Sequence, residues 1–168
     1  MFGMGKNPNR NRRIETQKRP RISAAALLEP SVFAEPWITG GEYTVAVLQG
    51  RALPSIRIET PATFYDYQAK YFRNDTKYFC PSGLSTEAEK HLANLALSTF
   101  DAVGAEGWGR ADFMMDKTGR PYLLEINTVP GMTDHSLVPM AARALDISFD
   151  QLVWQVLETS FTRVPVTP

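Results

Sequence analysis

The sequence GWGRADFMMDKTGRPYLLEIN, residues 107–127, has the pattern of a complete β-hairpin. Two runs rich in strand-forming residues flank Asp116–Arg120, whose aspartate, threonine and glycine are typical of a hairpin turn. We expect the turn to be centred near Thr118. In the resulting register, residues of the two strands pair as Asp112 with Glu125, Arg110 with Asn127, and Phe113 with Leu124.

Side chains alternate along a strand, so this register sorts the hairpin into a polar and an apolar face. The polar face carries Arg110, Asp112, Glu125 and Asn127. The apolar face carries Ala111, Phe113, Leu124 and Ile126. We expect the apolar face to cover a hydrophobic core.

The polar face places two carboxylates opposite each other. Asp112 and Glu125 would lie roughly 5 Å apart, and like charges at that distance are destabilising unless something neutralises them. A divalent cation bound by carboxylate and amide oxygens would do so, and Mg²⁺ typically leaves room for substrate phosphates. The alternative is a solvated face on which Arg110 balances the acids. The loop that follows the hairpin directly, Thr128–Thr133, favours the metal site.

Composition places the chain among globular proteins. Its 168 residues are enough for one domain, and 43% are hydrophobic. The formal net charge is zero, which argues against a general nucleic-acid binder. The single cysteine, Cys80, cannot form an internal disulfide. Because no apolar run approaches the roughly 18–20 residues of a membrane span and no signal peptide is recognisable, we expect a cytoplasmic protein without a membrane partner.

The N-terminal part differs from the rest. Residues 1–30 contain seven Lys or Arg against Glu15 and Glu29. We expect residues 1–21 to be a disordered basic leader, because they have too few apolar side chains to offset the entropy of ordering. Residues 22–31 are predicted to be a short helical connector, residues 32–161 the folded domain, and residues 162–168 a tail.

Within the folded domain, we expect a β-meander with strands at Glu42–Leu48 and around Ile56–Glu59, after a turn at Thr39–Gly41. The segment Thr60–Ser82 lacks periodicity but is rich in aromatic residues. It is therefore either a functional lid or an Ω-loop packed on its own rings.

Three helices are predicted besides the hairpin. The first begins with a capping box of Thr86 and Glu89, and its apolar face extends to Val103. The second covers Leu137–Leu145. The third is capped by Ser148 and Gln151.

Common nucleotide and metal motifs are missing from the sequence. It has neither a Gly-x-x-x-x-Gly-Lys-Ser/Thr loop nor a Gly-x-Gly-x-x-Gly motif. His91 and His135 lack a second His or Cys at the spacing of zinc ligands.

Six motifs together resemble the C-terminal half of the D-alanine–D-alanine ligases, which are ATP-grasp enzymes. In chain order they are Glu35-Pro36-Trp37, Gly41–Val45, Phe64–Tyr71, Gly107–Asp112, Leu124–Thr133 and His135–Pro139. The resemblance extends from about Val32 to about Leu157. It implies an α+β fold, the C-terminal ATP-grasp subdomain, in which helices flank an antiparallel sheet and one long loop is mobile.

The resemblance also implies an activity. Members of the family use ATP to form an acyl phosphate on one D-alanine, which the amine of a second D-alanine attacks. The product, D-alanyl-D-alanine, is a peptidoglycan precursor. A related reaction joins D-alanine to D-lactate, and Tyr71 favours the dipeptide.

By resemblance, the metal ligands are Asp112, Glu125 and Asn127, which would hold Mg²⁺ or Mn²⁺, two ions in all. Arg110 would stabilise the transferred phosphoryl group, a task that suits a fixed guanidinium. The ATP contacts would be Glu35 and Trp37 near adenine, Glu42 at the ribose and Lys70 at the phosphates.

The second D-alanine would be bound by Tyr71, Ser136 and Leu137, the last two at a helix start that suits a carboxylate. Gly131 would supply an oxyanion-stabilising N–H group.

The chain departs from the family in two ways. Pro36 stands where many relatives have lysine, and nothing in Met1–Glu29 resembles the family's N-terminal domain or its small central subdomain. We therefore expect a truncated form with weak nucleotide binding and negligible turnover on its own. The alternative is a non-catalytic remnant or Mg-nucleotide-binding module. A homodimer is compatible with the resemblance.

Overall fold

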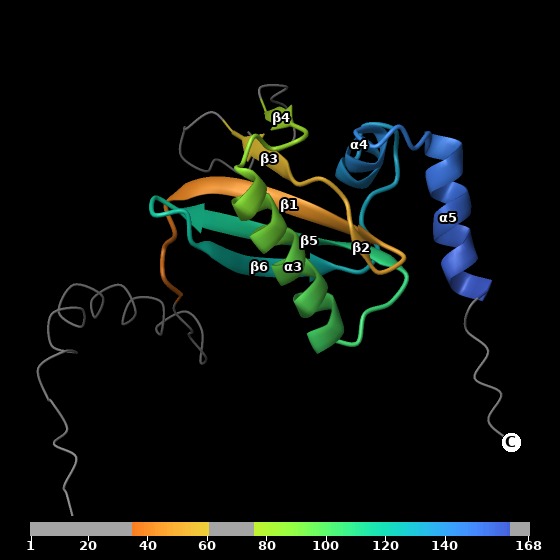
Figure 1. Ribbon diagram of the computed structural model, residues 1–168, viewed down its shortest axis with the longest axis horizontal. Helices are drawn as coiled ribbons and strands as arrows, with labels where there is room; N and C mark the ends of the chain where they lie inside the picture. Colours follow the sequence, from red (N-terminus) through yellow and green to blue (C-terminus); the bar gives the residue numbers. More distant parts are fainter. Residues whose placement is uncertain (1–34, 61–75, 162–168) are drawn as a thin grey trace, which may run out of the picture. The chain divides into compact units, whose positions relative to one another are not determined.

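The computed structural model describes residues 35–60 and 76–161. The chain divides into two units, Met1–Trp37 and Ile38–Pro168, each of which is described by itself. The elements of the second unit, drawn in Figure 1, are β1 (Gly40–Leu48), β2 (Arg51–Ala52), β3 (Ile56–Glu59), β4 (Lys77–Phe79), α3 (Thr86–Ala102), β5 (Trp108–Asp116), β6 (Pro121–Asn127), α4 (Leu137–Arg143) and α5 (Phe149–Phe161).

The described strands form one antiparallel sheet in the order β4-β3-β1-β5-β6, and β2 also pairs with β1. The predicted α+β fold of a sheet flanked by helices is confirmed. The strand predicted from Glu42 begins earlier, at Gly40, which pairs with Asp116, so the expected turn at Thr39–Gly41 is wrong. Most of the predicted long loop, residues 61–75, lies outside the described residues.

A tight hairpin joins β1 to β2. Leu48 pairs with Arg51, which leaves Gln49 and Gly50 as a two-residue turn. The φ angles of these two residues are 50° and 71°, as a type I′ turn requires. This turn reverses the chain next to the sheet centre, and β3 then continues along the same edge of β1.

One face of the sheet packs on α3. Side chains of β1 and β5 meet those of the helix in a cluster of buried residues: Tyr43, Val45, Val47, Ala111, Phe113 and Met115 with Leu92, Ala96 and Phe100. Figure 1 shows α3 lying across the sheet. Helix α3 ends as predicted before Gly104, whose φ is 63°, but Val103 is an exposed C-cap rather than part of the apolar face.

The opposite face is divided between a second core and a polar area. Ala46 and Leu48 pack with Val138, Ala141 and Ala142 of α4 and with Leu152 of α5. Because side chains alternate, Glu42 and Thr44 of β1 share this face with Arg110 and Asp112 of β5. The second core thus covers one part of the face, and the polar residues occupy another.

The β5–β6 register confirms two of the three predicted pairs of the hairpin. Arg110 pairs with Asn127 and Asp112 with Glu125. Beyond Asp112 the register shifts, so that Phe113 pairs with Leu123 and not with Leu124. The expected Phe113–Leu124 pair is therefore wrong. Leu124 is the extra residue at the irregularity and is 54% exposed, not part of the core face.

The start of α3 also differs from the prediction. Ser85, not Thr86, is the N-cap, and its hydroxyl accepts from the N–H of Ala88 at 3.3 Å. Glu89 does not complete a capping box. Its carboxylate instead accepts from the N–H and the hydroxyl of Ser55, each at 2.6 Å, and from the hydroxyl of Ser82 at 3.2 Å. The helix is thereby fastened to the segments before β3 and after β4.

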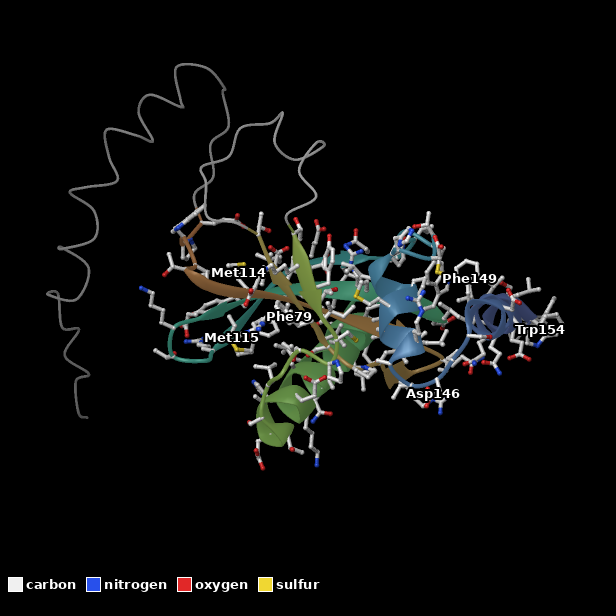
Figure 2. All side chains as sticks on the ribbon, turned by 90° about the horizontal axis from the view of Figure 1, so that it is seen from above. Phe79, Met114, Met115, Asp146, Phe149 and Trp154 are labelled. Carbon is white, nitrogen blue, oxygen red and sulfur yellow. The ribbon has the colours of Figure 1, made fainter. Side chains whose placement is uncertain are left out.

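Helix α5 has the predicted capping box. The Ser148 N–H donates to Gln151 Oε1 at 2.8 Å, and the Gln151 N–H donates to Ser148 Oγ at 3.2 Å. Of the apolar residues of α5, only Leu152 is buried, whereas Trp154 is 59% exposed and points away from the sheet (Figure 2). In the described part of the chain, none of the helices has the length and apolar character needed to span a membrane.

Candidate functional site

Asp112 is the centre of the polar face. Its Oδ1 accepts from Arg110 Nε at 2.8 Å and from the Thr44 hydroxyl at 2.6 Å. Its Oδ2 accepts from Arg110 Nη2 at 2.7 Å and from Asn127 Nδ2 at 2.9 Å. A carboxylate offers about four lone-pair sites, so every acceptor position of Asp112 is used. This network holds the carboxylate in one orientation.

Arg110 is a permanent cation in the midst of acids. The pKa of its guanidinium is raised above the ordinary value, first by the hydrogen bond to Asp112, while burial acts in the opposite direction. The charges of Asp112, Glu125 and Glu42 add to the increase. Arg110 therefore balances part of the negative charge on this face. The alternative to a metal site, a solvated face on which Arg110 balances the acids, also requires this.

Asn127 joins the two carboxylates that the register brings together. Its Nδ2 donates to Asp112 Oδ2 at 2.9 Å and to Glu125 Oε1 at 3.1 Å. One oxygen of each acid is thus directed at the same point. Turning the Asn127 amide about its last bond would add a third oxygen at that point. Two carboxylate oxygens and an amide oxygen are a donor set that suits Mg²⁺ or Mn²⁺, so the residues fit the implied metal.

The metal site remains a proposal. Among the described residues, no group of three or more His, Cys, Asp or Glu side chains could hold a metal ion. The hairpin has two carboxylates and one amide, which would leave other ligand positions of Mg²⁺ to water or phosphate.

Thr44 is a member of the site that the sequence analysis missed. It lies on β1 directly opposite Asp112 and is 1% exposed. The sequence does show that Thr44, two residues after Glu42 in an alternating strand, shares a face with Glu42. It does not show that β1 pairs with β5, and so it does not place Thr44 next to Asp112. Glu42 itself is half-buried on the same face.

The loop after β6 brings together two other predicted residues. A Cβ added to Gly131 would lie 3.0 Å from Ser136 Oγ, so the two residues are close neighbours. The Ser136 hydroxyl accepts from the N–H of Thr133 at 3.0 Å and lies 2.9 Å from the Thr133 hydroxyl. Ser136 is the N-cap of α4, without a side-chain cap bond, and Leu137 is the first residue of the helix.

The structure does not place the remaining predicted residues relative to this site. Lys70 and Tyr71 lie outside the described residues. Glu35 and Trp37 are exposed, in a segment without helix or strand that belongs to the separate unit Met1–Trp37.

Comparison with known proteins supports the fold and the family. The family model for the D-ala D-ala ligase C-terminus matches residues 11–158. A D-alanine–D-alanine ligase of Nitrosococcus oceani is 58% identical over 139 residues, which are 83% of this chain and 44% of that protein. The corresponding ligase of Alkalilimnicola ehrlichii is 59% identical over 139 residues, 83% of this chain and 45% of that protein.

Two solved structures are similar to this chain in both fold and sequence. The D-alanine–D-alanine ligase of Bacillus anthracis complexed with ATP has a TM-score of 0.65 and 31% identity, covering 76% of this chain and 40% of that chain. The VanG D-Ala:D-Ser ligase of Enterococcus faecalis has a TM-score of 0.66 and 30% identity, covering 74% of this chain and 37% of that chain.

The sheet, its helices and these neighbours define the C-terminal part of an ATP-grasp fold. Within that class, the chain belongs to the D-Ala–D-Ala ligase C-terminus family. It spans less than half the length of the curated relatives that it matches.

Proposed function

We propose that this protein takes part in the ATP-dependent ligation of two D-alanine molecules to D-alanyl-D-alanine, through an acyl phosphate, in peptidoglycan precursor synthesis. The observation that carries the proposal is the convergence of Asp112 Oδ2 and Glu125 Oε1 on one point beside the Arg110 cation. The names of the relatives, D-alanine–D-alanine ligases, support this choice of reaction.

In the proposed site, Asp112, Glu125 and Asn127 hold Mg²⁺ or Mn²⁺, two ions together with the phosphates of ATP. When bound, the ions neutralise phosphate charge and help to orient the nucleotide. Protein oxygens on two paired strands suit this task, because the sheet holds them at a constant separation.

Arg110 has the role of a fixed positive charge for the phosphoryl group during its transfer. Its support is the two-pronged bond to Asp112, which orients the guanidinium, and the raised pKa, which keeps it charged. From the family resemblance we assign Lys70 to the phosphates as a second cation, Glu42 to the ribose hydroxyls, and Glu35 and Trp37 to adenine.

The second D-alanine is assigned to the loop before α4. From the family resemblance, Ser136 and Leu137 are assigned to its carboxylate, Tyr71 to its binding, and Gly131 to an N–H group for the developing oxyanion. The support within the described residues is the close approach of Gly131 to the Ser136 hydroxyl, which leaves little room for a larger residue at position 131.

The test measures nucleotide binding and turnover separately on the 168-residue chain. Calorimetric titration with magnesium and β,γ-imido-ATP should show metal-dependent binding that Asp112→Asn abolishes. The matched control is Asp116→Asn, the same change at the far end of β5 in the exposed turn. Absence of binding by the unmodified chain would contradict the proposal.

Turnover distinguishes the ligase from a binding module. Release of ADP that depends on D-alanine supports ligation by this chain. Metal-dependent binding without any such release supports the alternative of a Mg-nucleotide-binding module. Replacing D-alanine by D-lactate or D-serine in the same assay then determines the second substrate.

A further inference from the structure

We propose that Thr44 is a positioning residue: by holding Asp112 Oδ1 in the sheet, it leaves Oδ2 as the oxygen that faces the metal and nucleotide. This inference rests on the proposed function, since it concerns the same site. Thr44 is a neutral residue on β1, whereas the charged and amide groups of the polar face, Arg110, Asp112, Glu125 and Asn127, lie on β5 and β6.

The contact of Thr44 with Asp112 is short and enclosed. The Thr44 hydroxyl donates to Asp112 Oδ1 at 2.6 Å, and Ala111 O is more distant at 3.3 Å. A threonine hydroxyl has one proton, so the carboxylate is its principal acceptor. Thr44 is 1% exposed, and its branched side chain is restricted at χ1. The hydroxyl therefore has few ways to turn elsewhere.

The two oxygens of Asp112 differ in how replaceable their partners are. Oδ1 is held by Thr44 from the core of the sheet, whereas Oδ2 shares Asn127 Nδ2 with Glu125. Asn127 can exchange its donor for an acceptor by turning its amide, whereas the Thr44 hydroxyl lies closer to Asp112 Oδ1, at 2.6 Å, than to its other acceptor, Ala111 O, at 3.3 Å. Oδ2 is therefore the oxygen that a cation can reach, and Oδ1 is the oxygen that remains in the sheet.

Arg110 cannot make this selection by itself. Its guanidinium binds both oxygens, Oδ1 at 2.8 Å and Oδ2 at 2.7 Å, so it favours neither. In the proposed function Arg110 also interacts with phosphate, and any shift toward phosphate weakens its hold on the carboxylate. Thr44 is then the donor that keeps Asp112 oriented.

The experiment compares Thr44→Val, which removes the hydroxyl and keeps the branched shape, with Thr44→Ser, which keeps the hydroxyl. Binding of Mn²⁺ with β,γ-imido-ATP is measured by calorimetry and by the EPR spectrum of the bound ion. Loss of an outer partner of a metal ligand typically weakens binding by roughly 10–100-fold. We expect that loss, with an altered spectrum, for Thr44→Val, and a change of less than about threefold for Thr44→Ser.

The matched control is Thr99→Val on α3, whose hydroxyl donates to Leu95 O at 2.6 Å on the other side of the sheet. It should leave binding unchanged, and circular dichroism at the assay temperature confirms that every variant is folded. Unchanged binding by Thr44→Val, even with reduced thermal stability, would overturn the inference, as would equal losses in the valine and serine variants. Absence of binding by the unmodified chain would overturn the proposed function itself, and with it this inference.

Discussion

Arg110 and Asp112, two residues apart on β5, form a two-pronged ion pair with distances of 2.8 Å and 2.7 Å. The side chains are 19% and 13% exposed. Parallel bonds of this kind match the planar fork of arginine to the carboxylate. The pair orders the polar face, so its geometry contributes to stability as well as to the proposed chemistry.

Replacing the fork by a single ammonium should weaken the pair. Lysine can bond one carboxylate oxygen well but not both, so Arg110→Lys should lower the free energy of unfolding by about 1–2 kcal/mol. Urea unfolding monitored by circular dichroism measures the change. Arg51→Lys, at an exposed position of β2, is the control and should change stability by less than about 0.5 kcal/mol. Equal effects at the two positions would contradict the prediction.

The carboxylate of Glu89 is expected to be a major stabilising contact outside the site. It accepts three hydrogen bonds from Ser55 and Ser82, and these serines are 1% and 2% exposed. Glu89→Ala removes the acceptor of the Ser55 N–H and leaves the two serine hydroxyls with their mutual hydrogen bond of 2.7 Å, so we expect a loss of about 2–4 kcal/mol in the free energy of unfolding.

Chemical unfolding of Glu89→Ala is compared with that of Glu87→Ala, an exposed acid in the same first turn of α3. The control loses only the interaction with the helix dipole, about 0.3–1 kcal/mol. If both alanine variants unfold at the same urea concentration, the role assigned to Glu89 is wrong.

Some of these contacts could be predicted from the sequence and others could not. The pairing of Arg110 with Asn127 and of Asp112 with Glu125 could be predicted, because a short turn determines it locally. The irregularity at Leu124 could not, since adjacent leucines give no sign of which one is extra. Ser85 and Thr86 are both good N-cap residues, so the cap was ambiguous by one position.

The hydrogen-bond partners of Thr44 and Glu89 could not be predicted from the sequence for a different reason. Thr44 meets Asp112 across 68 positions of sequence, and Glu89 meets Ser55 across 34. Contacts of this kind depend on which strands become neighbours, and local periodicity does not contain that information. The charged members of the site were predictable from the hairpin and the motifs, whereas the neutral member required the sheet order.

Cys80 is expected to react slowly with alkylating reagents. Burial raises the pKa of its thiol, and the charge of Glu89 raises it further. The thiolate is the reactive form, so the rate of labelling by iodoacetamide should rise at a higher pH than for a free cysteine. The chain has one cysteine, so mass spectrometry of the labelled protein reports on this site alone.

The substitution Glu89→Gln separates the two causes of the raised pKa of Cys80, burial and the charge of Glu89. It removes the carboxylate charge and keeps the side-chain shape, so the labelling profile should move partly back toward lower pH. Burial, the larger cause, remains and prevents a complete return. The prediction would be contradicted if the unmodified protein had the same labelling profile as free cysteine. It would also be contradicted if the profile of Glu89→Gln did not differ from that of the unmodified protein.

The turn of the hairpin should make stability sensitive to acid through Asp116. Its Oδ1 accepts from the Thr118 hydroxyl at 2.6 Å, the Thr118 N–H at 2.8 Å and the Arg120 N–H at 3.0 Å. These bonds favour the ionised form, and the pKa of Asp116 is lowered, chiefly by the Thr118 hydroxyl. A carboxyl group whose pKa is lower in the folded state stabilises the fold above its unfolded pKa, about 3.9.

That contribution is lost as the pH falls through the lowered, folded pKa, because protonation then removes an acceptor from the turn. Urea midpoints measured between pH 7 and pH 2.5 should therefore fall less in Asp116→Asn than in the unmodified protein. Asp150→Asn, at an exposed position in the first turn of α5, is the control and should not flatten the curve to the same extent. Parallel curves for Asp116→Asn and the unmodified chain would show that the turn does not depend on the ionised carboxylate. The hairpin that carries Asp112 and Glu125 would then owe its stability to the pairing of β5 and β6 and not to its turn.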